Sequence, residues 1–286
     1  MSESQNIELR YVAPEGRLES MITSYYDLRF HGSLFTQSER ADNPQVRFQL
    51  SGEGYYTFRD GRTLTAYPVT IIGPTSGPRD AEATGPLYVT GFGLMPAGWA
   101  ALVKEDGYDW LDDGFDAREL LGDAVMQVWR QMRDAGSFEE RLKITQAYAE
   151  ALFPELDEAP DQFVRAVNAW LMASGSPDVD TLVAATGLSA RQVERLTKRY
   201  YGLPPKQLAR KYRALRAAGM IATGEAFDSS ELANAFYDQS HLTRELKQFT
   251  GLTPGQLKKR PPELLSLTMR ARKAMRKKIS PLISDT

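Results

Sequence analysis

The sequence contains no cysteine and only two histidines, His31 and His241. The absence of cysteine excludes disulfides, thiolate zinc sites, iron–sulfur clusters and a cysteine nucleophile. Two histidines that lie so far apart in the chain are too few for a histidine-rich metal cage. We therefore expect no metal ion, no cofactor and no catalytic residue.

Long apolar runs are also lacking, because no stretch approaches the roughly 20 residues that a membrane-spanning helix needs. The first residues, MSESQNIELR, do not show the charged and then apolar pattern of a secretory signal. The remaining composition, 42% hydrophobic and 25% charged, is that of an ordinary globular protein. These features predict a cytoplasmic protein that does not associate with membranes.

The formal net charge of -2 results from the cancellation of two larger charges. Residues 176–286 contain 20 Lys and Arg against 10 Asp and Glu, which gives this part a net charge of +10. The first 175 residues therefore carry a net charge of -12. A basic C-terminal part indicates a nucleic-acid partner, although a solvated basic surface without a partner would have the same charge.

Residues 7–95 alternate apolar and polar side chains between turn signals, which is typical of short β-strands. Asp60-Gly61, between YYTFR and RTLTAY, predicts a hairpin. The regular spacing of these strands predicts a small barrel or sandwich. Six aromatic residues are expected on these strands, namely Tyr55, Tyr56, Phe58, Tyr67, Phe92 and Trp99. They would line a pocket or, as is more common for aromatic residues on strands, pack in the hydrophobic core.

From about residue 116 the apolar spacing becomes helical, and the acidic, proline-containing stretch PELDEAPD then predicts a linker. The fold class predicted is an α+β multidomain chain with a small β-barrel at its N-terminus and an all-α C-terminal domain. The predicted parts are a β-rich domain over 1–110, a helical connector over 111–156, a helical domain over 160–260 and a basic extension over 261–286. The extension would contact phosphates, dock on the acidic N-terminal half, or form a solvated tail.

A repeat lies within the basic part of the chain. The segment GLPPKQL at 202–208 recurs 49 residues later as GLTPGQL at 251–257, and the preceding residues VERLTKRYYG and LTRELKQFTG align in the same register. Arg195 aligns with Arg244, and Lys198 aligns with Lys247. Two copies of one small helical unit are therefore expected.

Each copy has the pattern of a helix-turn-helix unit. In the first copy Gly187 permits a tight turn and Ser189 caps the second helix, and in the second copy Asp238 is the corresponding cap. The apolar residues expected to face inward are Val193, Leu196, Tyr200, Leu242, Leu246 and Phe249. The opposite faces carry polar and basic residues, namely Arg191, Arg195, Lys198, Ser240, Arg244 and Lys247.

Arginine can bind guanine edges through two hydrogen bonds and lysine suits phosphate, so such faces are those of helices that enter a DNA major groove, here called reading helices. The alternative is a helical repeat bundle with cationic faces. Between the copies, Pro204–Ala218 predicts one helix that starts with proline and is about 22 Å long. Such a stiff connector would hold two reading helices about one DNA turn, roughly 34 Å, apart.

With these residues, the segment from about Gln162 to Arg260 resembles the C-terminal DNA-binding domain of the AraC/XylS family of transcriptional regulators. The most specific part is FYDQSHLTRELKQFTGLTPGQL at 236–257, supported by GLSARQVERLTKRYYGLPPKQL at 187–208. The resemblance implies reading helices at about 190–201 and 239–250, and it implies that bases are read by Arg191, Glu194, Arg195, Gln239, Ser240, His241 and Arg244. The expected DNA-binding set also includes Gln192, Lys198, Arg199, Thr243 and Lys247.

The N-terminal region resembles the cupin-like sensor domain that precedes such DNA-binding domains in one subgroup of the family. That resemblance implies ligand sensing, dimerisation or partner docking. The usual cupin metal ligands are absent, since His31 is the only histidine in this region. The expected partners are double-stranded DNA, a small-molecule or protein effector at the N-terminal domain, a second copy in a homodimer, and RNA polymerase if the protein activates transcription.

Three functions compete at this point. The first is a sequence-specific transcriptional regulator, associated with the nucleoid, with two reading helices in successive major grooves. The second is an interaction protein that acts through protein partners while its acidic half autoinhibits the DNA-binding part. The third is an enzyme with an attached DNA-binding module, which is the weakest, because no thiolate, Ser/His/Asp or paired-carboxylate constellation is found.

Overall fold

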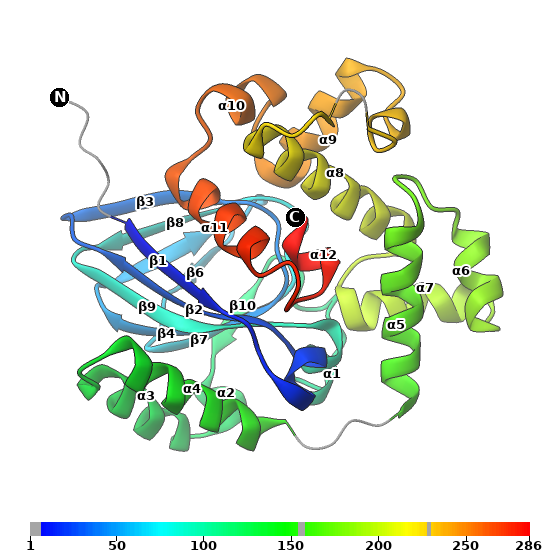
Figure 1. Ribbon diagram of the computed structural model, residues 1–286. Helices are drawn as coiled ribbons and strands as arrows, with labels where there is room; N and C mark the ends of the chain where they lie inside the picture. Colours follow the sequence, from blue (N-terminus) through cyan, green and yellow to red (C-terminus); the bar gives the residue numbers. More distant parts are fainter. Residues whose placement is uncertain (1–6, 154–157, 228–229) are drawn as a thin grey trace.

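The computed structural model describes residues 7–153, 158–227 and 230–286. Within these ranges every strand precedes residue 117, and the strands form two antiparallel sheets (Figure 1). In order across the six-stranded sheet, the strands are β1 (Ile7–Val12), β2 (Ile22–Phe30), β9 (Leu87–Leu94), β4 (Gln45–Ser51), β7 (Val69–Ile72) and β10 (Gly114–Asp116). The four-stranded sheet consists of β3 (Leu34–Glu39), β8 (Arg79–Thr84), β5 (Gly54–Thr57) and β6 (Thr63–Thr65).

The hairpin predicted at Asp60-Gly61 is confirmed. Strands β5 and β6 pair with Tyr56 opposite Leu64, and the turn between them contains both predicted residues. Gly61 has a φ of +86°, a left-handed conformation that glycine adopts without a steric penalty. Local turn chemistry therefore sets the register of this pair.

The β-rich N-terminal part and the helical C-terminal part are confirmed, but the strands do not close into a barrel. A barrel needs its first and last strands to pair with each other, whereas β1 and β10 remain the two edges of the larger sheet. Helix α11 (Glu263–Ala274) packs beside β1 (Figure 1). A helix from the far end of the chain thus occupies the side of an edge strand that a further strand would take in a barrel.

The helices divide into a group within the N-terminal part and a group after residue 157. The first group is the 3-10 helix η1 (Gly16–Ser20), α1 (Pro96–Leu102), α2 (Arg118–Leu121), α3 (Ala124–Asp134) and α4 (Phe138–Leu152). The second group is α5 (Glu158–Ala173), α6 (Val179–Thr186), α7 (Ala190–Tyr201), α8 (Pro205–Thr223), the 3-10 helix η3 (Ala233–Ala235), α9 (Gln239–Thr250), α10 (Pro254–Lys259), α11 and α12 (Pro281–Ser284). In the ranges given above, no helix has both the length and the apolar character needed to cross a bilayer.

Helices α3 and α4 lie against the face of the larger sheet that is turned away from α11 (Figure 1). The indole Nε1 of Trp129 donates to the carbonyl of Gln49 at 2.7 Å, and Arg141 pairs with the buried Asp27 at 3.5 Å. The predicted linker PELDEAPD spans residues 154–161. Its first half, 154–157, lies outside the described residues, and its second half belongs to helix α5, which begins at Glu158.

One apolar core continues from the larger sheet into the C-terminal helices. It runs from Val46 and Phe48 through Trp99 of α1, which is fully buried, to Val193 of α7 and Tyr212 of α8. The two halves of the chain therefore share buried surface instead of being joined only by a linker.

The C-terminal extension docks on the acidic N-terminal half, which was one of the three alternatives for it. Helix α11 packs on β1 and β3, and the guanidinium of Arg272 pairs with the carboxylate of Asp42 at 2.7 Å. The Arg272 side chain is 4% exposed, so this pair is shielded from water. The last residues, through α12, also contact α5 and α11.

Replacing Phe48 with alanine tests the importance of the shared core. Phe48 is fully buried in β4, so the change leaves a cavity and should lower the free energy of unfolding by about 3–5 kcal/mol. Urea unfolding monitored by circular dichroism measures this loss. The matched control is Leu34→Ala, since Leu34 is 64% exposed and its truncation should change stability by less than about 0.5 kcal/mol.

Candidate DNA-binding surface

The first predicted reading helix is α7, and its observed bounds, Ala190–Tyr201, agree with the expected 190–201. Ser189 caps it in a reciprocal arrangement, because its hydroxyl accepts from the Gln192 amide while the Gln192 side chain accepts from the Ser189 amide. Gly187 before the helix and Gly202 after it are left-handed, with φ of +66° and +75°. Local chemistry therefore defines both ends.

One face of α7 is buried and the other is exposed. Val193 and Thr197 are fully buried, and the Thr197 hydroxyl donates to the Val193 carbonyl at 3.0 Å, so this hydroxyl is satisfied within the helix. The exposed side chains lie in the first two turns and are Arg191, Gln192, Glu194 and Arg195. This division confirms the amphipathic pattern expected of α7.

Lys198 and Arg199, in the last turn of α7, are less exposed than the earlier polar residues. Lys198 pairs with Glu194 at 2.8 Å and lies 5.2 Å from the ring centroid of Tyr108, and Arg199 lies 3.8 Å from Asp106. Exposed ion pairs of this kind contribute little to stability. The two cations therefore remain near solvent but have acidic or aromatic neighbours.

The second predicted reading helix is α9, and its bounds, Gln239–Thr250, again agree with those expected. The carboxylate of Asp238 accepts from the His241 amide at 2.6 Å, and Gly251 ends the helix with a φ of +75°. The residues expected to face inward are buried, namely Leu242, Leu246 and Phe249. The second unit was predicted to have a first α-helix before the turn. Between α8 and α9 the described residues contain no such α-helix, and the 3-10 helix η3 lies there instead.

His241 is held by the protein itself. Its Nδ1 accepts from the Tyr237 amide at 3.2 Å, so the proton resides on Nε2, which lies 3.2 Å from the carboxylate of Glu245. The hydroxyl of Thr243 donates to the Gln239 carbonyl at 2.8 Å. The other expected residues of this unit point to solvent and are Gln239, Ser240, Arg244 and Lys247.

Glu245 anchors α9 to the long helix α8, a role that the sequence analysis missed. Its carboxylate is 1% exposed and accepts from the guanidinium of Arg213 at 2.6 and 2.9 Å and from that of Arg210 at 2.8 Å. Although burial by itself would raise the pKa of Glu245, the hydrogen bonds from Arg213 and Arg210 hold this pKa below its ordinary value. The sequence contained one sign of this role. Glu245 is an acidic residue on the otherwise apolar face of α9, and the preceding helix α8 is rich in arginine.

The linker helix α8 is longer than predicted, since it runs from Pro205 to Thr223 and spans 19 residues, or about 28 Å. Its Lys211 is buried and donates to the carbonyls of Asp42 and Thr75, each at 2.8 Å. Burial lowers the pKa of Lys211 to about 8. The connector between the two units is therefore fixed to the N-terminal domain.

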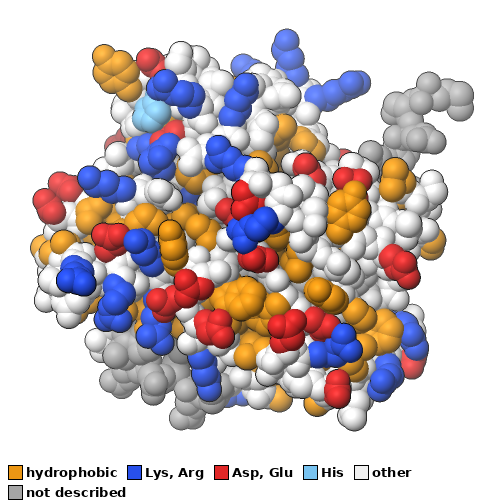
Figure 2. Space-filling view, turned by 180° about the vertical axis from the view of Figure 1, so that it is seen from behind, with side chains coloured by type: hydrophobic (Ala, Val, Ile, Leu, Met, Phe, Trp, Pro, Cys, Tyr) orange, Lys and Arg blue, Asp and Glu red, His pale blue; other side chains and the backbone are white. Residues whose placement is uncertain are grey.

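Both reading helices contact the N-terminal domain at their C-terminal ends. The Gly107 amide donates to the Arg199 carbonyl at 2.8 Å, and the Ala41 amide donates to the Phe249 carbonyl at 2.8 Å. The first turns of α7 and α9 remain exposed. Figure 2 shows that lysine and arginine side chains gather along the upper edge of one face, over the helical part of the molecule.

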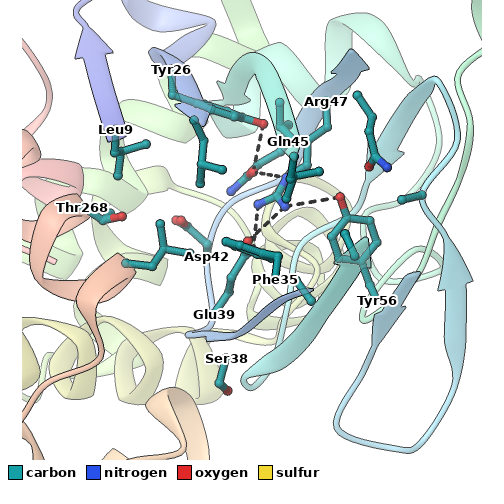
Figure 3. A pocket seen from close by; sticks show the side chains of 18 of the residues that line it. Leu9, Tyr26, Phe35, Ser38, Glu39, Asp42, Gln45, Arg47, Tyr56 and Thr268 are labelled. Carbon is teal, nitrogen blue, oxygen red and sulfur yellow. Dashed lines mark hydrogen bonds and ion pairs between the residues drawn. The ribbon is translucent and has the colours of Figure 1, made fainter. Parts of the chain in front are cut away.

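A cavity lies between the two sheets and helix α11 (Figure 3). On its wall the carboxylate of Glu39 pairs with Arg47 and Arg79 at 2.7 and 2.6 Å, and these arginines, against the effect of burial, lower the pKa of Glu39 to about 2. Of the aromatic residues expected on strands, Tyr55 and Tyr56 line this cavity and Phe92 is buried in β9. Phe58 and Trp99 are also buried, but Phe58 follows the end of β5 and Trp99 lies on helix α1. Among the described residues, no group of three Asp, Glu, His or Cys is arranged to hold a metal ion.

Replacing Glu245 with glutamine should lower the free energy of unfolding by about 3–5 kcal/mol at pH 7, because it leaves two arginines beside a neutral partner. The folded carboxyl has a lowered pKa, so its contribution is present above the unfolded value of about 4.3 and is lost as the pH falls through the folded pKa. The difference between wild type and variant should therefore shrink below pH 4. Urea titrations at several pH values measure it, with the exposed Glu139→Gln as control, and a difference that does not change with pH would contradict the assignment.

Comparison with known proteins supports the assignment of the helical half. Residues 182–260 match the family model of a helix-turn-helix domain. Over 85 residues the chain is 35% identical to the F1 operon positive regulatory protein of Yersinia pestis, a match that covers 29% of this chain and 28% of that relative. The chain therefore spans little more than a quarter of the length of this relative.

Several solved structures are similar to this chain at low sequence identity. A single-substitution variant of ToxT from Vibrio cholerae, in its apo form, has a TM-score of 0.45 and 9% identity, over 87% of this chain and 95% of that one. Unsaturated fatty acid bound wild-type ToxT has a TM-score of 0.42 and 12% identity, over 90% and 96% of the two chains. The AraC-like transcriptional activator CuxR has a TM-score of 0.33 and 15% identity, over 74% and 86%.

The matched segment 182–260 contains both reading helices, the linker helix and the repeated turns described above. Residues 182–260 therefore form a helix-turn-helix domain, as the two repeated units in the sequence predict.

Proposed function

We propose that the protein is a sequence-specific DNA-binding transcriptional regulator that inserts α7 and α9 into successive major grooves and is regulated through its N-terminal domain. The observation that carries this proposal is the equivalence of the two helices. Each has a capped N-terminus, a buried apolar face and an exposed polar first half, and both lie on one buried linker helix. In helix-turn-helix proteins the N-terminal residues of the recognition helix contact base edges.

The roles of the individual residues follow from their exposure and chemistry. Arg195 and Arg244 occupy aligned positions, are exposed, and suit the bidentate recognition of guanine. Lys247 and Lys198 suit phosphate, which contributes most of the affinity and little of the sequence choice. In this proposal Gln192 and His241 mainly shape the helix ends, since both are engaged in capping contacts.

We also propose that the protein has no enzymatic activity of its own, works in the cytoplasm at the nucleoid, and responds to an effector at the N-terminal domain. RNA polymerase would be a partner if it activates transcription, and a homodimer would place two such readers on one operator.

Arg195→Ala and Arg244→Ala should each weaken binding to the cognate site by about 1–3 kcal/mol and relax base preference in one half of the site only. Binding sites selected from a random DNA pool by the wild type provide the probe, and gel-shift titration and footprinting measure the effect. The matched control is Arg130→Ala, an exposed arginine of α3 in the N-terminal domain.

Lys247→Ala should differ from the arginine variants, because it removes a phosphate contact instead of a base contact. It should weaken binding to all DNA sequences equally and reduce the slope of log affinity against log salt concentration by about 1. An Arg195→Ala protein with unchanged affinity and footprint would contradict the assignment of α7.

The contacts between the N-terminal domain and the ends of α7 and α9 bear on a second candidate function. In that function the chain is an interaction protein, and its acidic half covers the DNA-binding helices. However, the polar contacts described above lie in the last turns of the two helices, at Lys198, Arg199, Gln248 and Phe249. The residues expected to read bases lie in the first two turns. The regulator is therefore the better-supported function.

Asp42→Asn distinguishes the two functions, because it removes the carboxylate that pairs with Arg272 between the two halves. If the reading faces are accessible in the docked protein, the DNA affinity should stay within about twofold of the wild type. A rise of tenfold or more, measured with the same probe on protein whose fold is verified by circular dichroism, would instead support autoinhibition.

A further inference from the structure

Tyr237 is the most exposed large hydrophobic residue in the part of the chain that the structure describes. It is 93% exposed, whereas the next such residue, Leu34, is 64% exposed. Neither the ring nor the hydroxyl of Tyr237 contacts a described residue through a hydrogen bond or a ring interaction. Single exposed apolar residues are common on protein surfaces, so the meaning of this one depends on where it lies.

The backbone at Tyr237 is held on both sides. The preceding Phe236 is buried, with ring centroids 6.1 Å from Phe227 and 5.7 Å from His241. The following Asp238 caps α9 by accepting from the His241 amide. The amide of Tyr237 itself donates to Nδ1 of His241 at 3.2 Å. These contacts fix Tyr237 at the N-terminal tip of α9 and leave its ring in solvent.

The first helix-turn-helix unit uses the equivalent position differently. By the 49-residue repeat, Tyr237 corresponds to Leu188, which also directly precedes the capping residue of its helix. Leu188 is partly buried against the apolar core. The same local position therefore serves packing in the first unit and not in the second. A ring that stays in water gains nothing from burial, so a partner that covers it would be stabilised by the hydrophobic effect.

We propose that Tyr237 is a further base-reading residue, whose ring contacts the 5-methyl group of a thymine in the major groove. The exposed residues continue without a break from 237 to 240, so Tyr237 extends the exposed first turn of α9 beyond the helix itself. In helix-turn-helix proteins this end of the recognition helix lies nearest the base edges. The thymine methyl is the apolar feature of the major-groove edge, and an aromatic ring matches it. The inference rests on the proposed function, because that function places α9 in the groove.

Two other partners match Tyr237 less well. A phosphate would engage only the hydroxyl and would leave the apolar ring in water. A partner protein would have to reach the tip of α9, where the neighbouring exposed residues Gln239 and Ser240 face DNA in the proposed function. A thymine methyl uses the ring and requires no change in the position of α9.

Gel-shift titration with the DNA site that the wild type selects tests this contact. Each thymine in the half-site whose preference Arg244→Ala relaxes is replaced singly by deoxyuridine, which lacks only the 5-methyl group. One replacement should weaken wild-type binding by about fourfold, the effect of one buried methyl group. Tyr237→Ala should bind the unmodified site about tenfold more weakly and should be insensitive to that replacement. Tyr237→Phe keeps the ring and should behave as the wild type does.

Tyr55→Ala is the matched control, because Tyr55 is a 42% exposed tyrosine on β5 in the N-terminal domain. It should bind both forms of the DNA as the wild type does. Since Tyr237 makes no buried contact, its replacement should retain the fold, which circular dichroism verifies.

Three results would overturn the proposal. Equal losses in Tyr237→Ala and Tyr237→Phe would assign the hydroxyl to a phosphate. Unchanged DNA affinity of Tyr237→Ala would leave the ring to a partner protein. Undiminished sensitivity of Tyr237→Ala to deoxyuridine would show that another group contacts the methyl.

The outcomes also separate this inference from the proposed function. If Arg244→Ala relaxes one half of the selected site while Tyr237→Ala binds as the wild type does, only the role of Tyr237 is wrong. If the wild type selects no DNA sequence at all, the proposed function is wrong and the role of Tyr237 fails with it.

Discussion

The segment Arg40–Asn43, between β3 and β4, connects almost every functional part of the molecule through buried polar contacts. Asp42 pairs with Arg272 of α11, and its carbonyl accepts from Lys211 of α8. The Ala41 amide donates to the end of α9, and Asn43 accepts from the hydroxyl of Tyr212. Because these groups are shielded from water, removing one leaves its partner unsatisfied, and the docking of the two halves depends on all of them together.

The two helix-turn-helix units share their local design but are anchored by different forces. Both reading helices have a side-chain cap and a left-handed glycine at the end. At one aligned position the first unit has Leu196, which is partly buried against the apolar core, whereas the second has Glu245, which is held by two arginines of α8. A charged anchor is more directional than an apolar one, so it defines the orientation of α9, before which the described residues form η3 and no α-helix of the second unit.

Charge has different roles on the surface and in the interior. The exposed cations of α7 and α9 lie in a high-dielectric environment where they contribute little to stability and remain available to a polyanion. Arg79 at Glu39, Arg272 at Asp42 and Arg213 at Glu245 are buried, and these pairs determine how the elements fit together. The acidic and basic halves therefore meet through a few specific pairs, not through a general attraction of opposite charges.

The sequence by itself determined the elements whose causes are local. Ser189, Asp238, Gly202 and Gly251 define the ends of α7 and α9, because a cap or a left-handed turn involves only neighbouring residues, and the Asp60-Gly61 hairpin follows from the same kind of chemistry. Only the tertiary structure decided that the strands form two sheets, that the basic extension covers β1, and that Glu245 and Arg272 are buried. Strand closure and charge burial depend on residues that lie up to 230 positions apart, as Asp42 and Arg272 do, and no local pattern specifies such pairs.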